Sequence, residues 1–336
     1  MCASGKTAAK KAKRRKVVIK FLELREKLND SFVALCLFGN DGWVKQRALS
    51  SVRQVYGVEA DDGMSFDTLD APTTDDIVYA CMSGSLFGGK KVVFVRGFVM
   101  PQGKQMQEVK RKLSKLFTQD DADYCVVFDL DNAKTLDGVD GVEFVDCNKL
   151  DGAGIGKWIT AYCRKQGVDA DPIAVRKLAE YCLCDMSRVA TETQKLIDYG
   201  KFDSESVDML VHKDVEYAVY DLSKLIASGN VQRAMASYKG LLAQGEDNRA
   251  LFGLLYNFYR RVYYVKTSTE LTEDKIAECL GVKRGAIMFA KDVAARYKPM
   301  QLKRALSAFV EADGKLKAFL DEDEVMTWLV FRLATL

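Results

Sequence analysis

The apolar residues of this chain follow two different patterns, and the change near Gly152 constrains the fold more than any other feature. Before Gly152, short continuous apolar runs alternate with segments of helical period. After it, every regular segment that we identify has helical period. Strands that alternate with helices are typical of a parallel sheet covered by helices, whereas successive helices form bundles. The sequence therefore predicts a doubly wound α/β domain followed by an all-α region.

Four apolar runs in the first part read as buried strands, at residues 32–38, 91–95, 125–128 and 142–145. A continuous apolar run is typical of a strand that is buried on both faces of a parallel sheet. Helical period indicates helices at 18–28, 43–55, 73–81 and 104–117. The third of these has Thr73 as a predicted N-cap, with Asp75 and Asp76 in the first turn, where the helix dipole favours acids.

The second part contains nine segments of helical period, separated mostly by Gly, Asn or Asp: 155–166, 172–183, 185–199, 214–228, 230–244, 248–266, 272–280, 283–296 and 299–317. A loop at residues 203–206 precedes a change near residue 213. We therefore expect a basic tail at 1–16, an α/β domain at 17–152, a small helical domain at 153–213 and a larger helical domain at 214–336.

Composition excludes several functional classes. At 336 residues, 48% hydrophobic and 29% charged, the chain can bury two or three separate cores. No apolar run approaches the roughly 18 residues needed to cross a bilayer, and no apolar stretch of the kind found in secretory signals follows the basic N-terminus. A cytoplasmic protein without membrane partners is expected.

Metal and histidine chemistry are also disfavoured. The nine cysteines are scattered and odd in number, which fits reduced thiols rather than a disulfide framework. Cys182 and Cys184 form the only close pair, with no histidine nearby, so a helix-packing role is favoured over a zinc site. The single histidine, His212, lies near an expected domain junction and reads as a surface residue. We expect no metal and no cofactor.

The N-terminal tail is strongly basic although the formal net charge of the chain is only +3. Residues 6–16 contain no acid, and such a block repels itself and stays solvated. It is also able to bind phosphate backbones through counterion release. A solvated tail and a DNA-binding arm both remain open. The candidate DNA-binding residues are Lys10, Lys11, Lys13, Arg14, Arg15 and Lys16.

The first strand and the helix after it are placed where a phosphate-binding loop would lie. Gly39 and Lys45 have the spacing of G-x-x-x-x-G-K-[ST]. However, Val44 replaces the second glycine and Gln46 replaces the hydroxyl residue that would bind Mg²⁺. The Cβ of Val44 would crowd a phosphate, and glutamine is a poor magnesium ligand. This degenerate loop predicts that the chain does not bind a nucleoside triphosphate.

The acidic pair that usually orients metal and water in such sites is also missing from its expected place. The strand at 91–95 is followed by Arg96 and Gly97. The next strand ends with Asp129 and Asp131, which are not adjacent and read as surface-loop aspartates. The sequence predicts no catalytic site.

Three stretches together resemble one family, the delta subunit of bacterial DNA polymerase III. Residues 37–41 resemble its strand followed by Gly-Glu-Asp, with Asn40 in place of the glutamate. Residues 83–95 resemble its Ser-Leu-Phe turn before a strand, and residues 184–199 resemble a later helix, with Cys184 where glycine is common. The likeness covers roughly 17–330 and includes 219–222, 229–230, 241–242, 245–246, 259–261, 276–282 and 302–317.

This resemblance implies an AAA+-like α/β domain, a helical lid and a helical collar that assembles with other clamp-loader subunits, of the ATPase gamma/tau type and the delta-prime type. It also implies a subunit that hydrolyses no ATP, and that binds and opens the sliding clamp for loading onto primed DNA. The family's clamp-binding turn corresponds to Ser85, Leu86 and Phe87.

The residues alone leave other roles open. Leu86 and Phe87 lie between Ser83-Gly84 and Gly88-Gly89, which allows them to project from the domain. They could instead cap the core of their own domain. The residues alone favour this alternative, and only the resemblance favours projection. An active AAA+ ATPase and a DNA-binding adaptor that works through the basic tail are the rival functions. Nucleotide binding would identify the first, and steeply salt-dependent DNA binding would identify the second.

Overall fold

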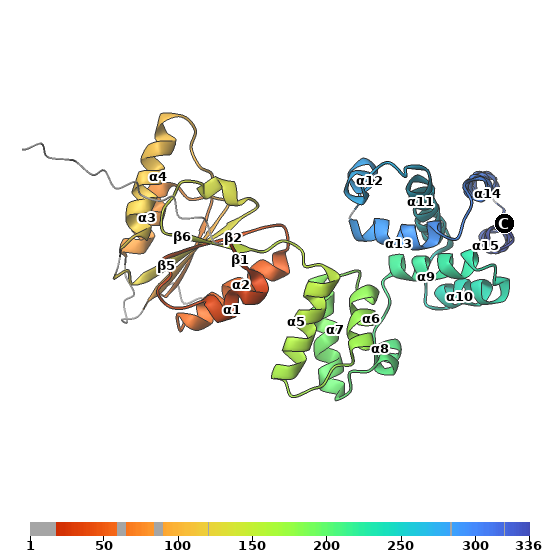
Figure 1. The fold of residues 1–336 in the computed structure, drawn as a ribbon, viewed down its shortest axis with the longest axis horizontal. Coiled ribbons are helices and arrows are strands. Elements are labelled where there is room, and N and C mark those ends of the chain that lie inside the picture. The colour runs from red at the N-terminus through yellow and green to blue at the C-terminus, as the bar shows by residue number, and fades with distance from the viewer. Residues whose placement is uncertain (1–17, 59–64, 84–89, 120, 283, 319) are drawn as a thin grey trace, which may run out of the picture. The chain divides into compact units, whose positions relative to one another are not determined.

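The computed structural model describes residues 18–336 except 59–64, 84–89, 120, 283 and 319. The described residues form two compact units, one that ends at Trp158 and one that begins at Ile159. The first unit has an α/β fold, and the second is helical (Figure 1). This order confirms the prediction of an α/β part followed by an all-α part. The finer division of the helical part at residue 213 stays a prediction.

Six parallel strands form one sheet in the order β1-β6-β2-β5-β4-β3. The four predicted strands correspond to β2, β4, β5 and β6. The sequence analysis missed the two edge strands, because β1 has only three residues and β3 carries polar side chains. The strands are β1 (Val18–Lys20), β2 (Ala34–Phe38), β3 (Phe66–Asp70), β4 (Lys91–Arg96), β5 (Tyr124–Leu130) and β6 (Val142–Asp146).

Helices cover both faces of the sheet (Figure 1). One face carries α3 (Thr74–Met82) and α4 (Lys104–Phe117), and the other carries α1 (Phe21–Lys27) and α2 (Gly42–Val55). A helix was predicted from residue 18, but the helical part begins only at Phe21 because the first three residues pair with β6. A short 3-10 helix, η1 (Ala133–Leu136), follows β5.

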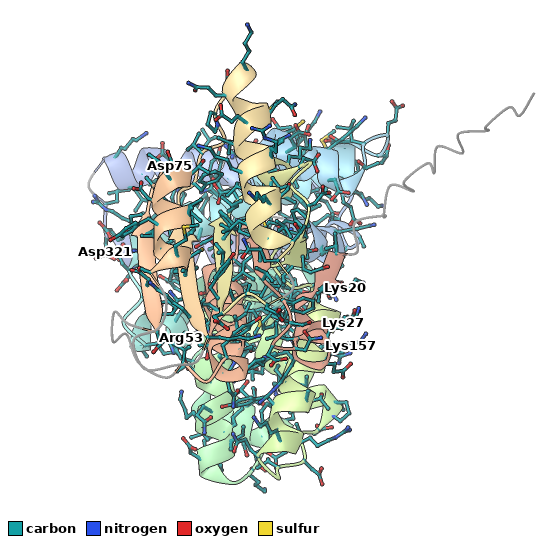
Figure 2. The ribbon with its side chains drawn as sticks, turned by 90° about the vertical axis from the view of Figure 1, so that its left-hand side faces the viewer. Lys20, Lys27, Arg53, Asp75, Lys157 and Asp321 are labelled. Carbon is teal, nitrogen blue, oxygen red and sulfur yellow. The ribbon has the colours of Figure 1, made fainter. Side chains whose placement is uncertain are left out.

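The core of this unit lies between the sheet and α3 and α4. Cys36, Val126 and Phe128 from the central strands pack there with Ile77 of α3 and Leu113 of α4. Residues 34–37 of β2 are completely buried. Since neighbouring strand residues point to opposite faces, β2 is buried on both faces, as predicted. Charged side chains such as that of Lys27 project from the outside of the unit (Figure 2).

The second unit consists of helices that follow the predicted segments closely. Two helices were missed, α8 and α15; α8 is short and falls where a loop was expected. The helices are α5 (Gly152–Lys165), which spans the boundary between the units, α6 (Pro172–Tyr181), α7 (Met186–Tyr199), α8 (Ser204–Leu210), α9 (Val215–Ala227), α10 (Val231–Ala243), α11 (Asn248–Thr267), α12 (Glu273–Leu280), α13 (Arg284–Ala294), α14 (Pro299–Lys317) and α15 (Glu322–Ala334).

The aromatic helix α11 supplies part of the core of this unit. Tyr259 is completely buried, packs against Phe309 of α14, and shares a hydrogen bond of 3.0 Å with Tyr297. Phe258 is buried as well, whereas Tyr256 and Tyr264 remain partly exposed. The buried pair therefore serves the packing of this unit.

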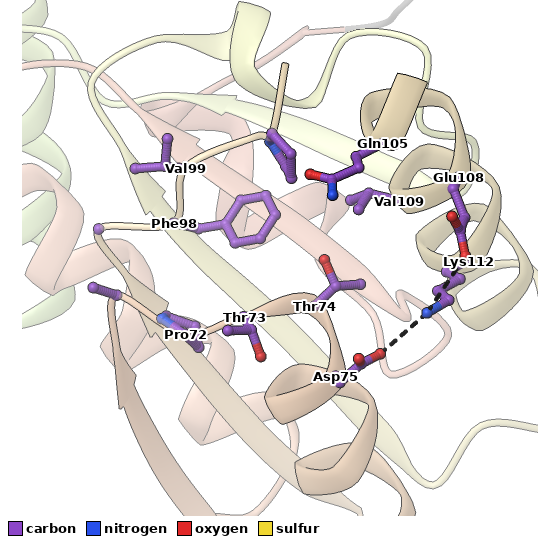
Figure 3. Close-up of a pocket in the computed structure, with 13 residues that line it drawn as sticks. Pro72, Thr73, Thr74, Asp75, Phe98, Val99, Gln105, Glu108, Val109 and Lys112 are labelled. Carbon is purple, nitrogen blue, oxygen red and sulfur yellow. Dashed lines mark hydrogen bonds and ion pairs between the residues drawn. The ribbon is translucent and has the colours of Figure 1, made fainter. Parts of the chain in front are cut away.

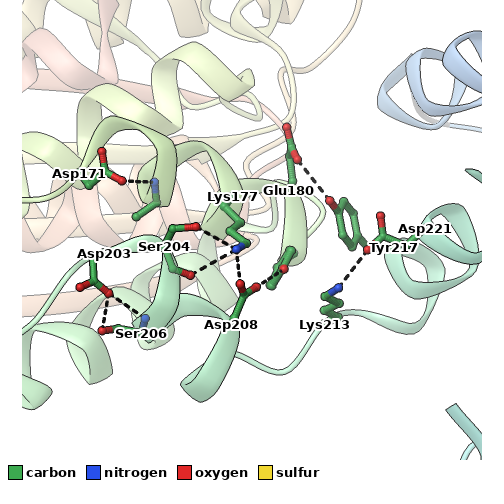
Figure 4. A network of polar contacts seen from close by, with 12 residues as sticks. Asp171, Lys177, Glu180, Asp203, Ser204, Ser206, Asp208, Lys213, Tyr217 and Asp221 are labelled. Atoms are coloured by element: carbon green, nitrogen blue, oxygen red, sulfur yellow. Dashed lines mark hydrogen bonds and ion pairs between the residues drawn. The ribbon is translucent and has the colours of Figure 1, made fainter. Parts of the chain in front are cut away.

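Polar contacts connect α6, α8 and α9 (Figure 4). The Nζ of Lys177 donates to Asp208, whose other oxygen accepts the hydroxyl of Tyr181 at 2.6 Å. Lys213 pairs with Asp221 at 2.9 Å, and its Nζ lies 4.8 Å from the ring centroid of Tyr181. These charges and rings hold the segment before α9 against α6. Within the described residues, no helix has both the length and the apolar character needed to cross a membrane.

Candidate functional site

The loop after β2 has the strand, turn and helix arrangement that the sequence predicts. Its turn, however, packs against the residue that follows β6, the neighbour of β2 in the sheet. The backbone N–H of Asp41 donates to the carbonyl of Cys147 at 3.2 Å. Gly39 has a φ of +139°, and a Cβ added there would lie 2.4 Å from the carbonyl carbon of Cys147. Gly39 is thus required by the close approach of two backbones, whether or not a phosphate binds.

The start of α2 carries its own negative charge. The Oδ1 of Asp41, which is buried, accepts the backbone N–H of Val44 at 3.1 Å. Val44, the residue in place of the second loop glycine, is completely buried. A helix N-terminus attracts anions through its free N–H groups and its dipole. Here a carboxylate occupies that position, and it would repel the phosphates of a nucleotide.

Lys45 is also occupied within the domain. Its Nζ lies 2.6 Å from the Oδ1 of Asp129 and 3.9 Å from the Oδ1 of Asp131, at the end of β5. The structure thus brings together two groups that the sequence analysis considered separately, the lysine of the degenerate loop and the aspartates after the third predicted strand. Gln46 is exposed on the outside of α2. In an active loop the lysine would contact a phosphate, whereas here Lys45 neutralises an aspartate.

The end of β4 carries a basic residue where a metal-binding acid would be expected. Arg96 forms two contacts with the carboxylate of Asp70 on β3, at 2.7 Å and 2.9 Å. The two residues are register partners in the sheet. Arg96 thus connects the end of β4 to the edge strand β3. Among the described residues, no cluster of His, Cys, Asp or Glu is arranged to hold a metal ion.

A hollow of about 510 Å³ lies between the ends of β3 and β4 and the helices α3 and α4 (Figure 3). Thr73 on its wall is engaged as the N-cap of α3, and Lys112 reaches across to Asp75 at 3.3 Å. Both of these polar groups are therefore engaged within the domain. The lining residues are Ala71, Pro72, Thr73, Thr74, Asp75, Gly97, Phe98, Val99, Pro101, Gln105, Glu108, Val109 and Lys112.

The predicted clamp-binding turn, Ser85, Leu86 and Phe87, lies outside the described residues, as does the basic tail with Lys10, Lys11, Lys13, Arg14, Arg15 and Lys16. Both ends of the segment that contains the turn are described. At its start, α3 ends at Met82 with Ser83 as C-cap, and at its finish β4 begins at Lys91.

Lys91 connects the two ends of that segment. Its side chain is buried, and its Nζ donates to the Oγ of Ser83 at 2.8 Å and to the carbonyl of Ala80 at 3.0 Å. The carboxylate of Asp67 on β3 lies 3.4 Å from the same nitrogen. The sequence analysis did not single out Lys91. A lysine that opens an otherwise buried apolar strand was the available signal.

Two apolar side chains stand exposed on α3, just before the predicted turn. Tyr79 is 77% exposed and Met82 is 76% exposed, and their spacing of three residues places them on one face of the helix. The opposite face buries Ile77, Ala80 and Cys81 in the core. Sequence reasoning also missed this exposed pair, because Tyr79 and Met82 lie within an apolar segment whose other members are buried.

Comparisons with known proteins show what the C-terminal part of this chain is similar to. Residues 216–332 match the family model for the DNA polymerase III delta subunit, C-terminal domain. This match falls within the helical unit and within the predicted collar at 214–336. A search of curated protein sequences finds no match.

The structure resembles that of a DNA clamp loader delta protein from Bacillus subtilis, with a TM-score of 0.72 and 16% sequence identity. The alignment covers 94% of this chain and 98% of the other. At this identity the likeness shows a shared fold. A replication initiator DnaA bound to AMPPCP and single-stranded DNA aligns over 94% of this chain and 91% of its own, at 14% identity, with a TM-score of only 0.36, which does not establish a common fold.

The predicted fold class, a parallel α/β domain followed by helical regions, is confirmed, and the C-terminal match and the shared fold both agree with the resemblance to the delta subunit of DNA polymerase III.

Proposed function

We propose that this chain, a delta-type subunit of DNA polymerase III by its C-terminal domain and its fold, binds a sliding clamp and holds it open for loading onto primed DNA. The observation that supports this most strongly is the match to a clamp loader delta protein over nearly the full length of both chains. In this proposal residues 153–213 act as a lid. Residues 214–336 act as the collar that joins the gamma/tau-type and delta-prime-type subunits.

The clamp contact in this proposal is the turn Ser85, Leu86 and Phe87, together with the exposed pair Tyr79 and Met82 on the preceding helix. Large exposed apolar side chains that gather next to one another favour a protein partner. Each such side chain contributes roughly 1.5–3 kcal/mol when a partner buries it fully. The aromatic and aliphatic members of this set are the types that dominate binding when they enter a pocket.

No bond chemistry is needed for this function. A subunit that binds the open clamp more tightly than the closed clamp shifts the equilibrium toward the open form by the difference in binding free energy. The energy of the cycle then comes from ATP bound by partner subunits. The paired Lys45 and the carboxylate of Asp41 at the start of α2 support this division of labour, because they oppose nucleotide binding in this chain.

The test is direct binding of the full chain to purified sliding clamp, measured by calorimetry. We expect a one-to-one complex that forms without nucleotide. Micromolar ATP binding together with absent clamp binding would instead favour the rival reading, an active AAA+ ATPase.

A further inference from the structure

We propose that α4 binds the phosphate backbone of double-stranded DNA through a basic stripe, which consists of Lys104, Arg111 and Lys115. The inference rests on the proposed function, in which the clamp is loaded onto DNA, and it gives this chain a DNA contact of its own. All three side chains are exposed. Helix α4 as a whole contains five basic residues and a single acid, Glu108.

The stripe follows from the helical period of α4. Its row of charged residues begins at Lys104 and ends at Lys115, with spacings of four, three and four positions, so these residues lie in one line along the helix. Leu113, Leu116 and Phe117 occupy the opposite side and are buried in the core beneath the helix. The row therefore points away from the core. At a rise of 1.5 Å per residue, the stripe is about 16 Å long.

The cations of the stripe form no ion pair with any residue that the structure describes. Lys112, beside the stripe, lies 3.3 Å from Asp75 and 3.9 Å from Glu108 (Figure 3). On the other side of the helix, the backbone N–H of Asp140 donates to the Oγ of Ser114 at 2.9 Å, which places one further acid beside α4. Lys112 is thus used within the domain, whereas the stripe remains available to an anion outside it.

The charge of α4 contrasts with that of the rest of the α/β unit. In residues 18–158 outside α4, acids clearly outnumber basic residues. A surface that is mostly acidic repels a polyanion, whereas one basic element on it attracts the polyanion to a single place. This contrast indicates a defined contact at α4 rather than a general affinity of the unit for anions.

The side chains around the stripe favour a phosphate backbone over a protein surface. Gln105 and Gln107 are exposed beside it, and α4 exposes no large apolar side chain. Protein interfaces have an apolar centre, whereas DNA interfaces are more polar and much more positively charged. Glutamine side chains also donate to phosphate oxygens. The length of about 16 Å exceeds the roughly 12 Å width of the major groove, so the two ends can reach phosphates of both strands.

The test is a triple variant of the full chain, Lys104→Gln, Arg111→Gln, Lys115→Gln, which neutralises the stripe. The dissociation constant for a short mixed-sequence DNA duplex would be measured without clamp at several salt concentrations. Thermal melting would confirm that the variant is folded. The basic tail stays in place in every protein compared, so its contribution to DNA binding is common to all of them.

A second triple variant, Lys20→Gln, Arg47→Gln, Lys157→Gln, is the matched control. It removes the same amount of charge from exposed residues of the same unit, on β1, α2 and α5 (Figure 2). It therefore reports the effect of net charge alone.

The expected results separate a contact from a net-charge effect. Each lost phosphate contact should reduce the slope of log affinity against log salt by about one, because fewer counterions are released. The stripe variant should thus lose about three from the slope and bind the duplex at least about tenfold more weakly at low salt, whatever the DNA sequence. The control should keep the slope and the affinity of the unaltered chain.

A change of the opposite sign is available at Glu108. Glu108→Gln removes the acid that lies within the row, and it should tighten DNA binding about twofold to threefold, because the carboxylate repels phosphate. A gain in affinity cannot arise from unfolded protein. Unchanged or weaker DNA binding by Glu108→Gln would contradict the stripe.

Three other results would overturn the inference: an unaltered salt slope in the folded stripe variant, an equal loss in the control, or no duplex binding by the unaltered chain at low salt. Clamp affinity, measured without DNA, separates these failures from that of the proposed function. It should be the same in every variant. Lost clamp binding with intact DNA binding in the stripe variant would mean that the stripe faces an acidic protein surface, which refutes the DNA contact. Absent clamp binding by every protein, with the predicted salt slopes, would refute only clamp binding.

Discussion

The Nζ of Lys45 lies 2.6 Å from the Oδ1 of Asp129, so the lysine of the degenerate phosphate loop is paired with an aspartate at the end of a neighbouring strand. The side chain of Asp41 caps the same helix that Lys45 belongs to. One end of the loop is thus negatively charged, and its lysine is already neutralised. Both features oppose the binding of a nucleoside triphosphate, independently of the missing glycine and hydroxyl.

We therefore predict that restoring the motif does not restore nucleotide binding. The double variant Val44→Gly, Gln46→Thr matches the phosphate-loop motif again. Lys45 remains paired with Asp129 in this variant, and Asp41 remains the N-cap of α2. Calorimetry with ATP and Mg²⁺ should detect no binding for either the unaltered chain or this variant. A micromolar dissociation constant for the variant would show that the two missing motif residues, rather than the internal pairing, prevent binding.

The basic tail is predicted to be separable from clamp binding. Residues 1–16 have no apolar face to bury, so their removal should leave the melting temperature and the clamp affinity nearly unchanged. If the tail serves as a DNA-binding arm, its removal should also flatten the salt dependence of DNA binding. A large loss of thermal stability on truncation would show instead that the tail packs against the domain.

The polar network of the helical unit predicts a dependence of stability on pH. Partial burial by itself raises the pKa of Asp208, but hydrogen bonds from Lys177 and Tyr181 outweigh this effect and hold the pKa below its usual value. A depressed pKa contributes stability above the unfolded-state pKa, near 4, and this contribution is lost as pH falls through the folded-state pKa. Asp208→Asn should therefore lower stability at pH 7.

The size of that effect should be below about 1 kcal/mol, because Asp208 is partly exposed and solvent screens its charge. Melting curves of the unaltered chain and of Asp208→Asn should converge as pH falls below about 4. A difference that is equally large at pH 3 and pH 7 would show that the substitution acts through packing and not through the charge of Asp208.

The exposed pair on α3 predicts a binding effect without a stability effect. Tyr79→Ala combined with Met82→Ala should weaken clamp binding at least about tenfold, since 1.4 kcal/mol of lost contact suffices for that change. The melting temperature should hardly move, because substitutions of exposed side chains usually stay within about 0.5 kcal/mol. A loss of clamp binding in this double variant could then not be attributed to unfolded protein.

A control with the same exposure lies on the same domain, away from the turn. Val99 is 78% exposed at the other end of β4. Val99→Ala should leave clamp binding unchanged. If it weakens binding as much as the α3 double variant does, the clamp contact covers more of the domain than α3 and the turn.

The sequence patterns were sufficient for most of the fold because burial leaves a strong periodic signal. The central strands β2, β4 and β5 are continuous apolar runs, and α4 was predicted with its observed bounds. The edge strands were missed because half of their environment is solvent. β3 has polar residues at three of its five positions, and β1 buries only Ile19, so neither differs clearly from a loop or a helix start.

The pairings within the candidate sites could not be predicted, since they join residues that are distant in sequence. Lys45 meets Asp129, and Lys91 meets Ser83 and Asp67, only after the sheet has formed. Cys184, which the resemblance places where glycine is expected, has a φ of +56°. This left-handed conformation is one that residues other than glycine adopt less readily.

In the function that we propose, Leu86 and Phe87 bind and open the sliding clamp. The most direct measurement compares the full chain with the double variant Leu86→Ala, Phe87→Ala, with clamp affinity and thermal melting recorded side by side. We predict at least about a tenfold loss of clamp affinity, which corresponds to 1.4 kcal/mol, and little change in melting temperature. If the two residues belong to the core of their own domain, the same double substitution should instead lower stability by several kcal/mol, as large-to-small core changes do. Unchanged clamp affinity in a fully folded double variant would contradict the assignment of this turn as the clamp-opening element.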